Sequence, residues 1–63
     1  MTKILVVEDS KVIREEICEI LQFEDFDVIW AENGLQGLEQ AKRELPNLIL
    51  SDISMPKLNG YQF

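Results

Sequence analysis

Apolar and polar positions follow one another along the chain in blocks that predict five elements of secondary structure. Three short runs of aliphatic, β-branched and aromatic residues predict strands at residues 4–7, 27–31 and 48–50. Two longer stretches carry apolar side chains three and four positions apart, which predicts amphipathic helices at residues 11–22 and 34–45.

Capping residues and a helix breaker mark the ends of these helices. Ser10 is a suitable N-cap for the first helix and Asn33 for the second, while Pro46 ends the second. The residues expected to face the core are Ile13, Ile17, Ile20 and Leu21 in the first helix and Leu35, Leu38, Ala41 and Leu45 in the second. After the third strand, residues 52–60 predict a loop, and Tyr61–Phe63 predict the start of another helix.

Strands that alternate with helices imply a parallel α/β sheet with right-handed crossovers. The first and third strands are apolar on both faces, as strands covered by helices on both sides are. The second strand carries Asp27 and leads to Glu32, so it is the better candidate for an edge. We therefore expect the strand order 2-1-3, with the two helices on opposite faces of the sheet.

Acidic residues follow two of the predicted strands directly. Glu8 and Asp9 come after the first strand, and Asp52 comes after the third. In an open α/β sheet, ligands bind at the carboxyl ends of the strands, where the strand order reverses. If the three carboxylates share that crevice, their repulsion is on the order of 10 kcal/mol at an effective dielectric of about 20, which favours a hard cation such as Mg²⁺. The alternatives are acids that favour the helix dipole and an Asp that begins a turn.

The charge balance and the lack of histidine exclude several classes of function. The chain has 63 residues, a net charge of −6 and no histidine. An acidic surface argues against direct binding to nucleic acid or to anionic membranes. Without histidine, these residues cannot perform Ser-His or Cys-His catalysis or donate a phosphoryl group from histidine. The single cysteine, Cys18, and the lack of an export signal or a long apolar segment lead us to expect a cytoplasmic protein.

The acidic residues belong to a set of motifs that resembles a known family. The motifs are Val7-Glu8-Asp9-Ser10, Arg14, Ala31-Glu32-Asn33-Gly34 and Asp52-Ile53-Ser54-Met55-Pro56-Lys57-Leu58-Asn59-Gly60. In this combination, the whole chain resembles the receiver domain of response regulators in two-component signalling. The resemblance implies that Asp52 is the phosphoacceptor for a histidine kinase or a phosphotransfer protein. It also implies a Mg²⁺ site with Asp9, Asp52 and the backbone carbonyl of Ser54 as ligands, and with Glu8 acting through water.

The resemblance further implies that residues 1–63 are the N-terminal half of a receiver domain. Receiver domains have a flavodoxin-like fold with strand order 2-1-3-4-5, so this chain is expected to be truncated before strands 4 and 5. In the family, strand 4 ends in a Ser or Thr and strand 5 in a Lys, and both contact the phosphoryl group. We therefore expect a signalling domain, not an enzyme, that is impaired in phosphorylation and output. Gly37 is a smaller departure, because the family usually has Ala there, and it loses about 1 kcal/mol of helix propensity.

Two other classes of function stay open. Without a fourth strand, the apolar third strand is an edge that invites pairing with another chain, so we expect a homo-oligomer through that edge. The alternatives are packing through the uncovered helix and sheet faces, or a molten state. The chain would then be a self-associating folding or design fragment with no signalling activity. The other class is a metal-dependent phosphatase with Asp52 as nucleophile, although such enzymes usually carry an acidic residue where this chain has Ser54.

Overall fold

The computed structural model describes residues 1–51, which form three strands and two helices in alternation. The strands are β1 (Lys3–Val7), β2 (Asp27–Ala31) and β3 (Leu48–Ser51), and the helices are α1 (Lys11–Phe23) and α2 (Gly34–Glu44). All of them lie where the hydrophobic pattern predicts them, and their ends differ from the prediction by one residue at most. The loop and the helix start expected within residues 52–63 lie outside the described residues.

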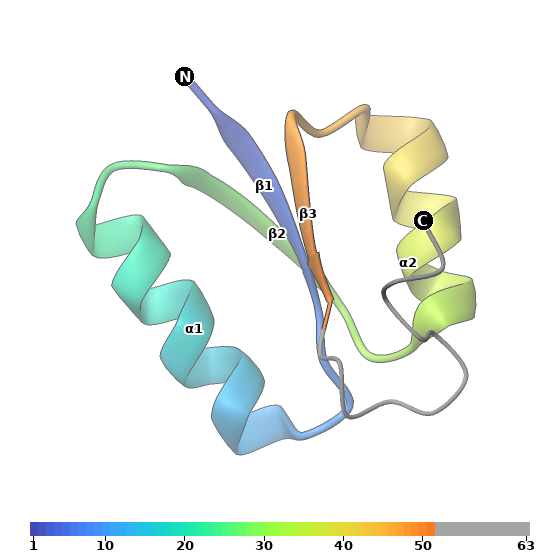
Figure 1. Ribbon diagram of the computed structural model, residues 1–63, viewed down its shortest axis with the longest axis horizontal. Coiled ribbons are helices and arrows are strands. Elements are labelled where there is room, and N and C mark those ends of the chain that lie inside the picture. Colours follow the sequence, from blue (N-terminus) through green and yellow to red (C-terminus); the bar gives the residue numbers. More distant parts are fainter. Residues whose placement is uncertain (52–63) are drawn as a thin grey trace.

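The strands form one parallel sheet in the expected order, β2-β1-β3. Val7, the last residue of β1, is level with Ala31 of β2 and with Ser51 of β3. The two helices lie on opposite faces of the sheet, as predicted (Figure 1). The three strands therefore end together at one edge, which is where a ligand site is expected.

The central strand provides the centre of the core. The side chains of β1 from Ile4 to Val7 are at most 4% exposed. Successive side chains of a strand point to opposite faces, so β1 supplies apolar surface to both helices. On the α2 face, Leu5 and Val7 pack with Ala31 of β2 and with the partly buried Ala41 of α2.

Helix α1 contacts the sheet through a face that matches the predicted one only in part. Ile17 and Leu21 are partly buried, as expected, but Ile13 and Ile20 are 46% and 64% exposed. The most buried residue of α1 is Arg14, which is 7% exposed. The contact face is rotated toward Arg14, whose guanidinium donates to the Glu8 carbonyl and lies over the Trp30 ring.

Helix α2 packs through small residues, of which Ala41 was predicted to face the core and Gly37 was not. Three leucines that were expected to face the core are more than half exposed: Leu35, Leu38 and Leu45. Gly37 is buried instead, and a Cβ atom at this position would lie 2.8 Å from Cγ2 of Val7. The helix approaches β1 closely at Gly37, so the larger side chains lie beside the contact and remain exposed.

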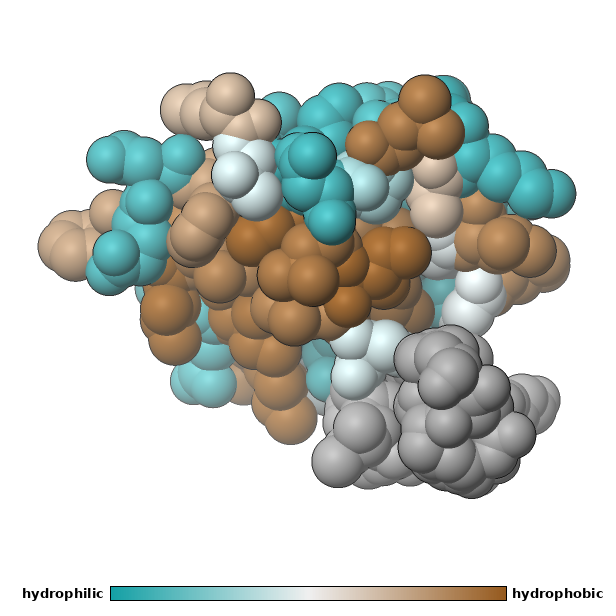
Figure 2. Space-filling model, turned by 45° about the horizontal axis from the view of Figure 1, so that its top comes forward, coloured by the Kyte–Doolittle hydropathy of each residue, from teal (hydrophilic) through white to brown (hydrophobic). Residues whose placement is uncertain are grey.

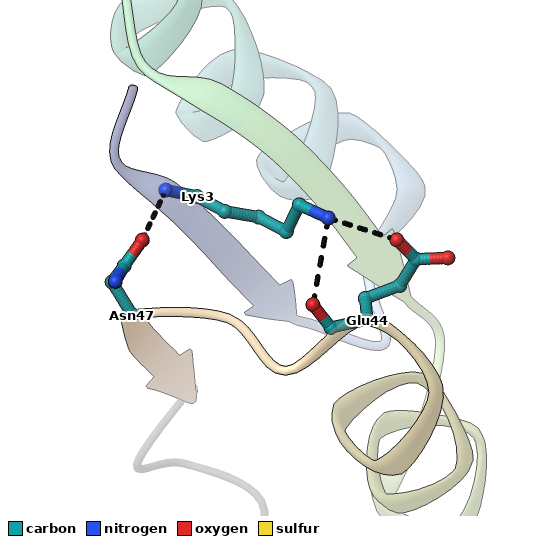
Figure 3. Close-up of polar contacts among 3 residues, drawn as sticks. All are labelled: Lys3, Glu44 and Asn47. Atoms are coloured by element: carbon teal, nitrogen blue, oxygen red, sulfur yellow. Dashed lines mark hydrogen bonds and ion pairs between the residues drawn. The ribbon is translucent and has the colours of Figure 1, made fainter.

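A polar network fixes the beginning of β1 at the opposite edge of the sheet (Figure 3). Lys3 Nζ donates to Glu44 Oε1 at 2.9 Å and to the Glu44 carbonyl at 3.4 Å. The backbone N–H of Lys3 donates to Asn47 Oδ1, and the backbone N–H of Asn47 donates to the Lys3 carbonyl, both at 2.8 Å. These contacts tie β1 to the turn between α2 and β3 and so help to set the register of β3.

Candidate functional site

The carboxyl ends of β1 and β3, each followed in the sequence by a predicted acidic residue, lie at the same edge of the sheet. Val7 and Ser51 are register partners, and Glu8 and Asp52 are the residues that follow them in the sequence. The backbone N–H of Glu8 donates to the Ala31 carbonyl at 3.1 Å, which continues the contact with β2 by one residue. The edge therefore has a fixed backbone up to the point where the acidic residues begin.

Glu8 is a buried part of this edge, with 2% of its surface exposed. Its carboxylate oxygen Oε2 accepts a hydrogen bond from the backbone N–H of Ser10 at 3.0 Å. Its backbone carbonyl accepts a second hydrogen bond from Arg14 Nη1, also at 3.0 Å. Glu8 thus shapes the turn between β1 and α1, while its predicted contact with a metal through water stays a prediction.

Asp9 is the exposed carboxylate of the same turn. It lies between Glu8 and Ser10, whose backbone groups are held by the hydrogen bonds just described. An exposed carboxylate can take part in binding a hard cation without first losing a buried partner. Asp9 is thus accessible from solvent, and its predicted role as a metal ligand stays a prediction.

Arg14 is a residue of this site that the hydrophobic pattern did not identify. Its Cζ atom lies 4.3 Å from the centre of the Trp30 ring on β2, and its Nη1 atom donates to the Glu8 carbonyl. A charged residue is rarely buried without such partners. A signal was present in the sequence, because Arg14 lies three and seven positions before Ile17 and Leu21, on the face that α1 buries.

Asp52 and Ser54 lie outside the described residues, so their predicted roles stay predictions. The described part of β3 ends at Ser51, whose hydroxyl oxygen is buried. Within residues 1–51 that hydroxyl has no hydrogen-bond partner. The structure thus describes the strand that leads to Asp52 but not the predicted phosphoacceptor itself.

The carboxylates at this edge are of the chemical kind that a hard divalent cation takes. Glu8 and Asp9 each supply a carboxylate, and carboxylate oxygens are among the ligands that Mg²⁺ prefers. In the part of the chain that the structure describes, no group of three or more His, Cys, Asp or Glu side chains is placed to hold a metal ion. A three-carboxylate site would therefore need Asp52 as well.

Away from this edge, the described residues 1–51 form an apolar groove and contain one cysteine. An apolar groove of about 210 Å³ between α2 and the sheet is lined by Leu5, Val7, Gly34, Gly37, Leu38, Ala41, Ile49 and Ser51.

Burial raises the pKa of the Cys18 thiol, which disfavours the nucleophilic thiolate. Neither α1 nor α2 is long and apolar enough to cross a membrane.

Comparison with known proteins gives a match over nearly the whole chain. The profile of the family described as "Response regulator receiver domain" matches residues 4–63. The virulence-factor transcription regulator BvgA of Bordetella pertussis is 38% identical over 61 residues, which are 95% of this chain and 29% of BvgA. Protein PilH of Pseudomonas aeruginosa is 40% identical over 62 residues, which are 98% of this chain and 51% of PilH.

A third relative carries the name of an enzyme. The protein-glutamate methylesterase/protein-glutamine glutaminase of Lawsonia intracellularis is 42% identical over 62 residues, which are 95% of this chain and 17% of the relative. The chain thus spans about half or less of the length of these three relatives. No solved structure gives a significant match.

Proposed function

This chain belongs to the response regulator receiver domain family, and from that premise we propose that it accepts a phosphoryl group on Asp52. Receiver domains are signalling domains. The proposed donor is a phosphohistidine of a histidine kinase or a phosphotransfer protein, and these 63 residues contain no histidine that could take its place. A carboxylate oxygen of Asp52 attacks phosphorus, the P–N bond to the donor imidazole breaks, and an aspartyl phosphate forms.

The observation that supports this proposal most directly is the register of β1 and β3. Val7 and Ser51 are paired in adjacent parallel strands, which are about 4.8 Å apart in a sheet. Glu8 and Asp52 follow these two positions in the sequence, and Asp9 comes one residue later. Phosphoryl transfer depends mainly on alignment and on neutralising charge, and a cluster of carboxylates at one sheet edge suits both needs.

We propose Mg²⁺ as the cofactor, held by Asp9, Asp52 and the backbone carbonyl of Ser54, with Glu8 acting through water. When bound, the ion supplies positive charge that offsets the repulsion between the Asp52 carboxylate and the anionic phosphoryl group. The two described acidic residues have different roles in this proposal. Asp9 is exposed and offers oxygen ligands to the ion, while Glu8 is buried and holds the turn by accepting a hydrogen bond from the Ser10 N–H.

We further propose that residues 1–63 correspond to the N-terminal half of a receiver domain. The chain spans about half or less of the relatives described above, and the family resemblance implies further phosphoryl contacts on a fourth and a fifth strand. The polypeptide of these 63 residues by itself is therefore expected to react more slowly than a full receiver domain. Its output is expected to be impaired for the same reason.

The test is the intact mass of the 63-residue polypeptide after incubation with a small acyl phosphate and Mg²⁺. We expect a single phosphoryl adduct on the wild type, none on Asp52→Asn, and much less when the metal is chelated. An adduct that persists in Asp52→Asn would place the phosphoryl group elsewhere and contradict the proposal. A wild type without any adduct would mean that Asp9, Asp52 and the metal do not suffice for acceptor chemistry and that the contacts of the further strands are required.

A further inference from the structure

We propose that Arg14 is a positioning residue for Asp9, because it holds the turn between β1 and α1 in a fixed shape. This inference rests on the proposed function of Asp9 as a Mg²⁺ ligand. It assigns a role to a side chain that is not among the proposed ligands. Three contacts carry the inference: Arg14 with the Glu8 carbonyl, Arg14 with Trp30, and the Glu8 carboxylate with Ser10.

Both peptide units that flank Asp9 are held by hydrogen bonds. The unit before Asp9 contains the Glu8 carbonyl, which accepts from Arg14 Nη1 at 3.0 Å. The unit after Asp9 contains the N–H of Ser10, which donates to Glu8 Oε2 at 3.0 Å. Because each peptide unit is planar, holding these two groups restrains the Cα atom of Asp9 and the direction in which its side chain leaves the backbone.

The guanidinium that holds the first of these units is itself fixed. Arg14 is 7% exposed, and its Cζ atom lies 4.3 Å from the centre of the Trp30 ring. Trp30 belongs to β2, which pairs with β1 in parallel, so the turn is braced against the sheet as well as against α1. A planar guanidinium can stack on a ring and donate in its own plane at the same time, which an ammonium group cannot do.

Helix stability does not explain a positive charge at this position. Arg14 lies at the N-terminal end of α1, where the helix dipole favours negative charge. Burying a charged group also costs free energy unless it gains partners. The partners that Arg14 gains lie in the turn and on β2, outside its own helix. We therefore infer that the residue serves the turn and, through it, Asp9.

The first test measures Mg²⁺ binding by titration calorimetry with magnesium chloride, corrected for the folded fraction of each variant. Arg14→Met removes both contacts, Trp30→Leu removes only the stacking, and Lys11→Met removes a positive charge from an exposed position of the same helix as a matched control. We expect the dissociation constant to rise about tenfold in Arg14→Met, as when groups that orient metal ligands are lost, and less in Trp30→Leu. An equal rise of the dissociation constant in Lys11→Met would show that the loss of any nearby positive charge has the same effect, and it would overturn the inference.

The second test needs no metal and separates this inference from the proposed function. It follows amide hydrogen exchange of Ser10 in the turn and of Leu5 in the core of β1. We expect faster exchange at Ser10 in Arg14→Met and Trp30→Leu, with exchange at Leu5 unchanged. If the wild type binds no Mg²⁺ but Ser10 responds in this way, the metal proposal fails and the positioning of the turn stands. Exchange that is unchanged at Ser10, or that rises equally at Ser10 and Leu5, overturns the inference.

Discussion

The contact between Gly37 and Val7 shows how packing and helix propensity compete at a single residue. Glycine in a helix is less favourable than alanine by about 1 kcal/mol. Here a Cβ atom on Gly37 would lie 2.8 Å from Val7 Cγ2 and 3.4 Å from Val7 Cγ1. Because valine is stiff at χ1, Val7 cannot easily turn both methyl groups away.

The substitution Gly37→Ala is therefore expected to lower the free energy of unfolding in the wild-type background. It is expected to raise that free energy once Val7 is replaced by a smaller residue. Overpacking costs about 1–3 kcal/mol, which equals or exceeds the gain in propensity of about 1 kcal/mol. In a Val7→Ala background the contact disappears, and the same change is expected to raise the free energy of unfolding by up to about 1 kcal/mol. Urea unfolding followed by circular dichroism measures this cycle. An identical effect in both backgrounds would show that the two residues are not coupled.

The residue scale is also where the sequence predicted least. The positions of Glu8 and Asp9 at the end of β1 followed directly from the apolar run before them. The burial of Arg14 and the exposure of Ile13 did not, because a stripe of apolar residues does not reveal how far a helix rotates to satisfy a polar group. The exposed leucines of α2 have a similar cause, since the close approach at Gly37 depends on the neighbouring strand.

At the scale of elements, the contact between Lys3 and Glu44 links the start of β1 to the end of α2. The hydrogen bond from Lys3 lowers the pKa of the Glu44 carboxyl below its ordinary value of 4.5. The hydrogen bond to Glu44 raises the pKa of the Lys3 ammonium above its ordinary value of 10.5. The Glu44 contribution to stability is present above its unfolded pKa and is lost as the pH falls through its folded pKa. The Lys3 contribution is present below its unfolded pKa and is lost as the pH rises through its folded pKa.

The variant Glu44→Gln is expected to reduce the loss of stability on acidification. The side chains of Lys3 and Glu44 are 28% and 35% exposed, so the effect is small and decreases as salt is added. The measurement is the urea midpoint of wild type and variant from neutral pH down through the titration of Glu44. Glu39→Gln, an exposed acid on the same helix, is the control. If both variants change the pH dependence equally, the ion pair contributes nothing specific.

The N-cap of α2 gives a second prediction at this scale. Asn33 Oδ1 accepts from the N–H of Gln36 at 2.8 Å, while the cap of α1 is weaker, with Ser10 Oγ 3.4 Å from the N–H of Ile13. Asn33→Ala is expected to lower the free energy of unfolding by about 1 kcal/mol, and Asn33→Asp is expected to preserve it. Ser10→Ala is expected to have a smaller effect. Chemical denaturation of the variants, compared at equal protein concentration, tests this order, and a larger loss in Ser10→Ala would contradict it.

Elements were the scale at which the sequence predicted most. Strand and helix periods, the N-caps Ser10 and Asn33, and the helix breaker Pro46 gave every described element and the strand order. These signals are local or depend on simple rules for connecting strands and helices. They therefore predict the elements without any knowledge of how the side chains pack. The segment after Ser51, which carries the predicted phosphoacceptor, is not among the described residues, so its predicted loop stays a prediction.

At the scale of the whole molecule, β3 presents an apolar edge. Within residues 1–51, β3 pairs only with β1, and its residues Leu48, Ile49 and Leu50 are 38–50% exposed. Figure 2 shows hydrophobic residues gathered across the middle of one face of the molecule. We propose that the 63-residue polypeptide self-associates, with two β3 edges pairing around a two-fold axis. The net charge of −6 on each copy opposes this pairing, so added salt is expected to strengthen it.

Sedimentation velocity over a range of concentrations tests self-association. Ile49→Lys places a charge on the edge strand and is expected to shift the protein toward monomer. Ile20→Lys changes a residue of α1 that is similarly exposed and is expected to leave the association unchanged. A folded wild type that stays monomeric at high concentration would refute the proposal. An equal effect of the two substitutions on the association would show that the interface is not specific to the β3 edge.

The place of β1 in the middle of the sheet has a consequence for synthesis on the ribosome. Lys3 and Asn47, which hydrogen-bond across β1 and the start of β3, are separated by 44 residues along the chain. At about 5–20 residues per second, the ribosome needs roughly 2–9 s to make that interval. During this time β1, the most buried of the three described strands, has left the catalytic centre before its second neighbour exists. The order of the strands in space thus sets a waiting period in time, during which β1 is made but its neighbour β3 is not yet there to pair with it.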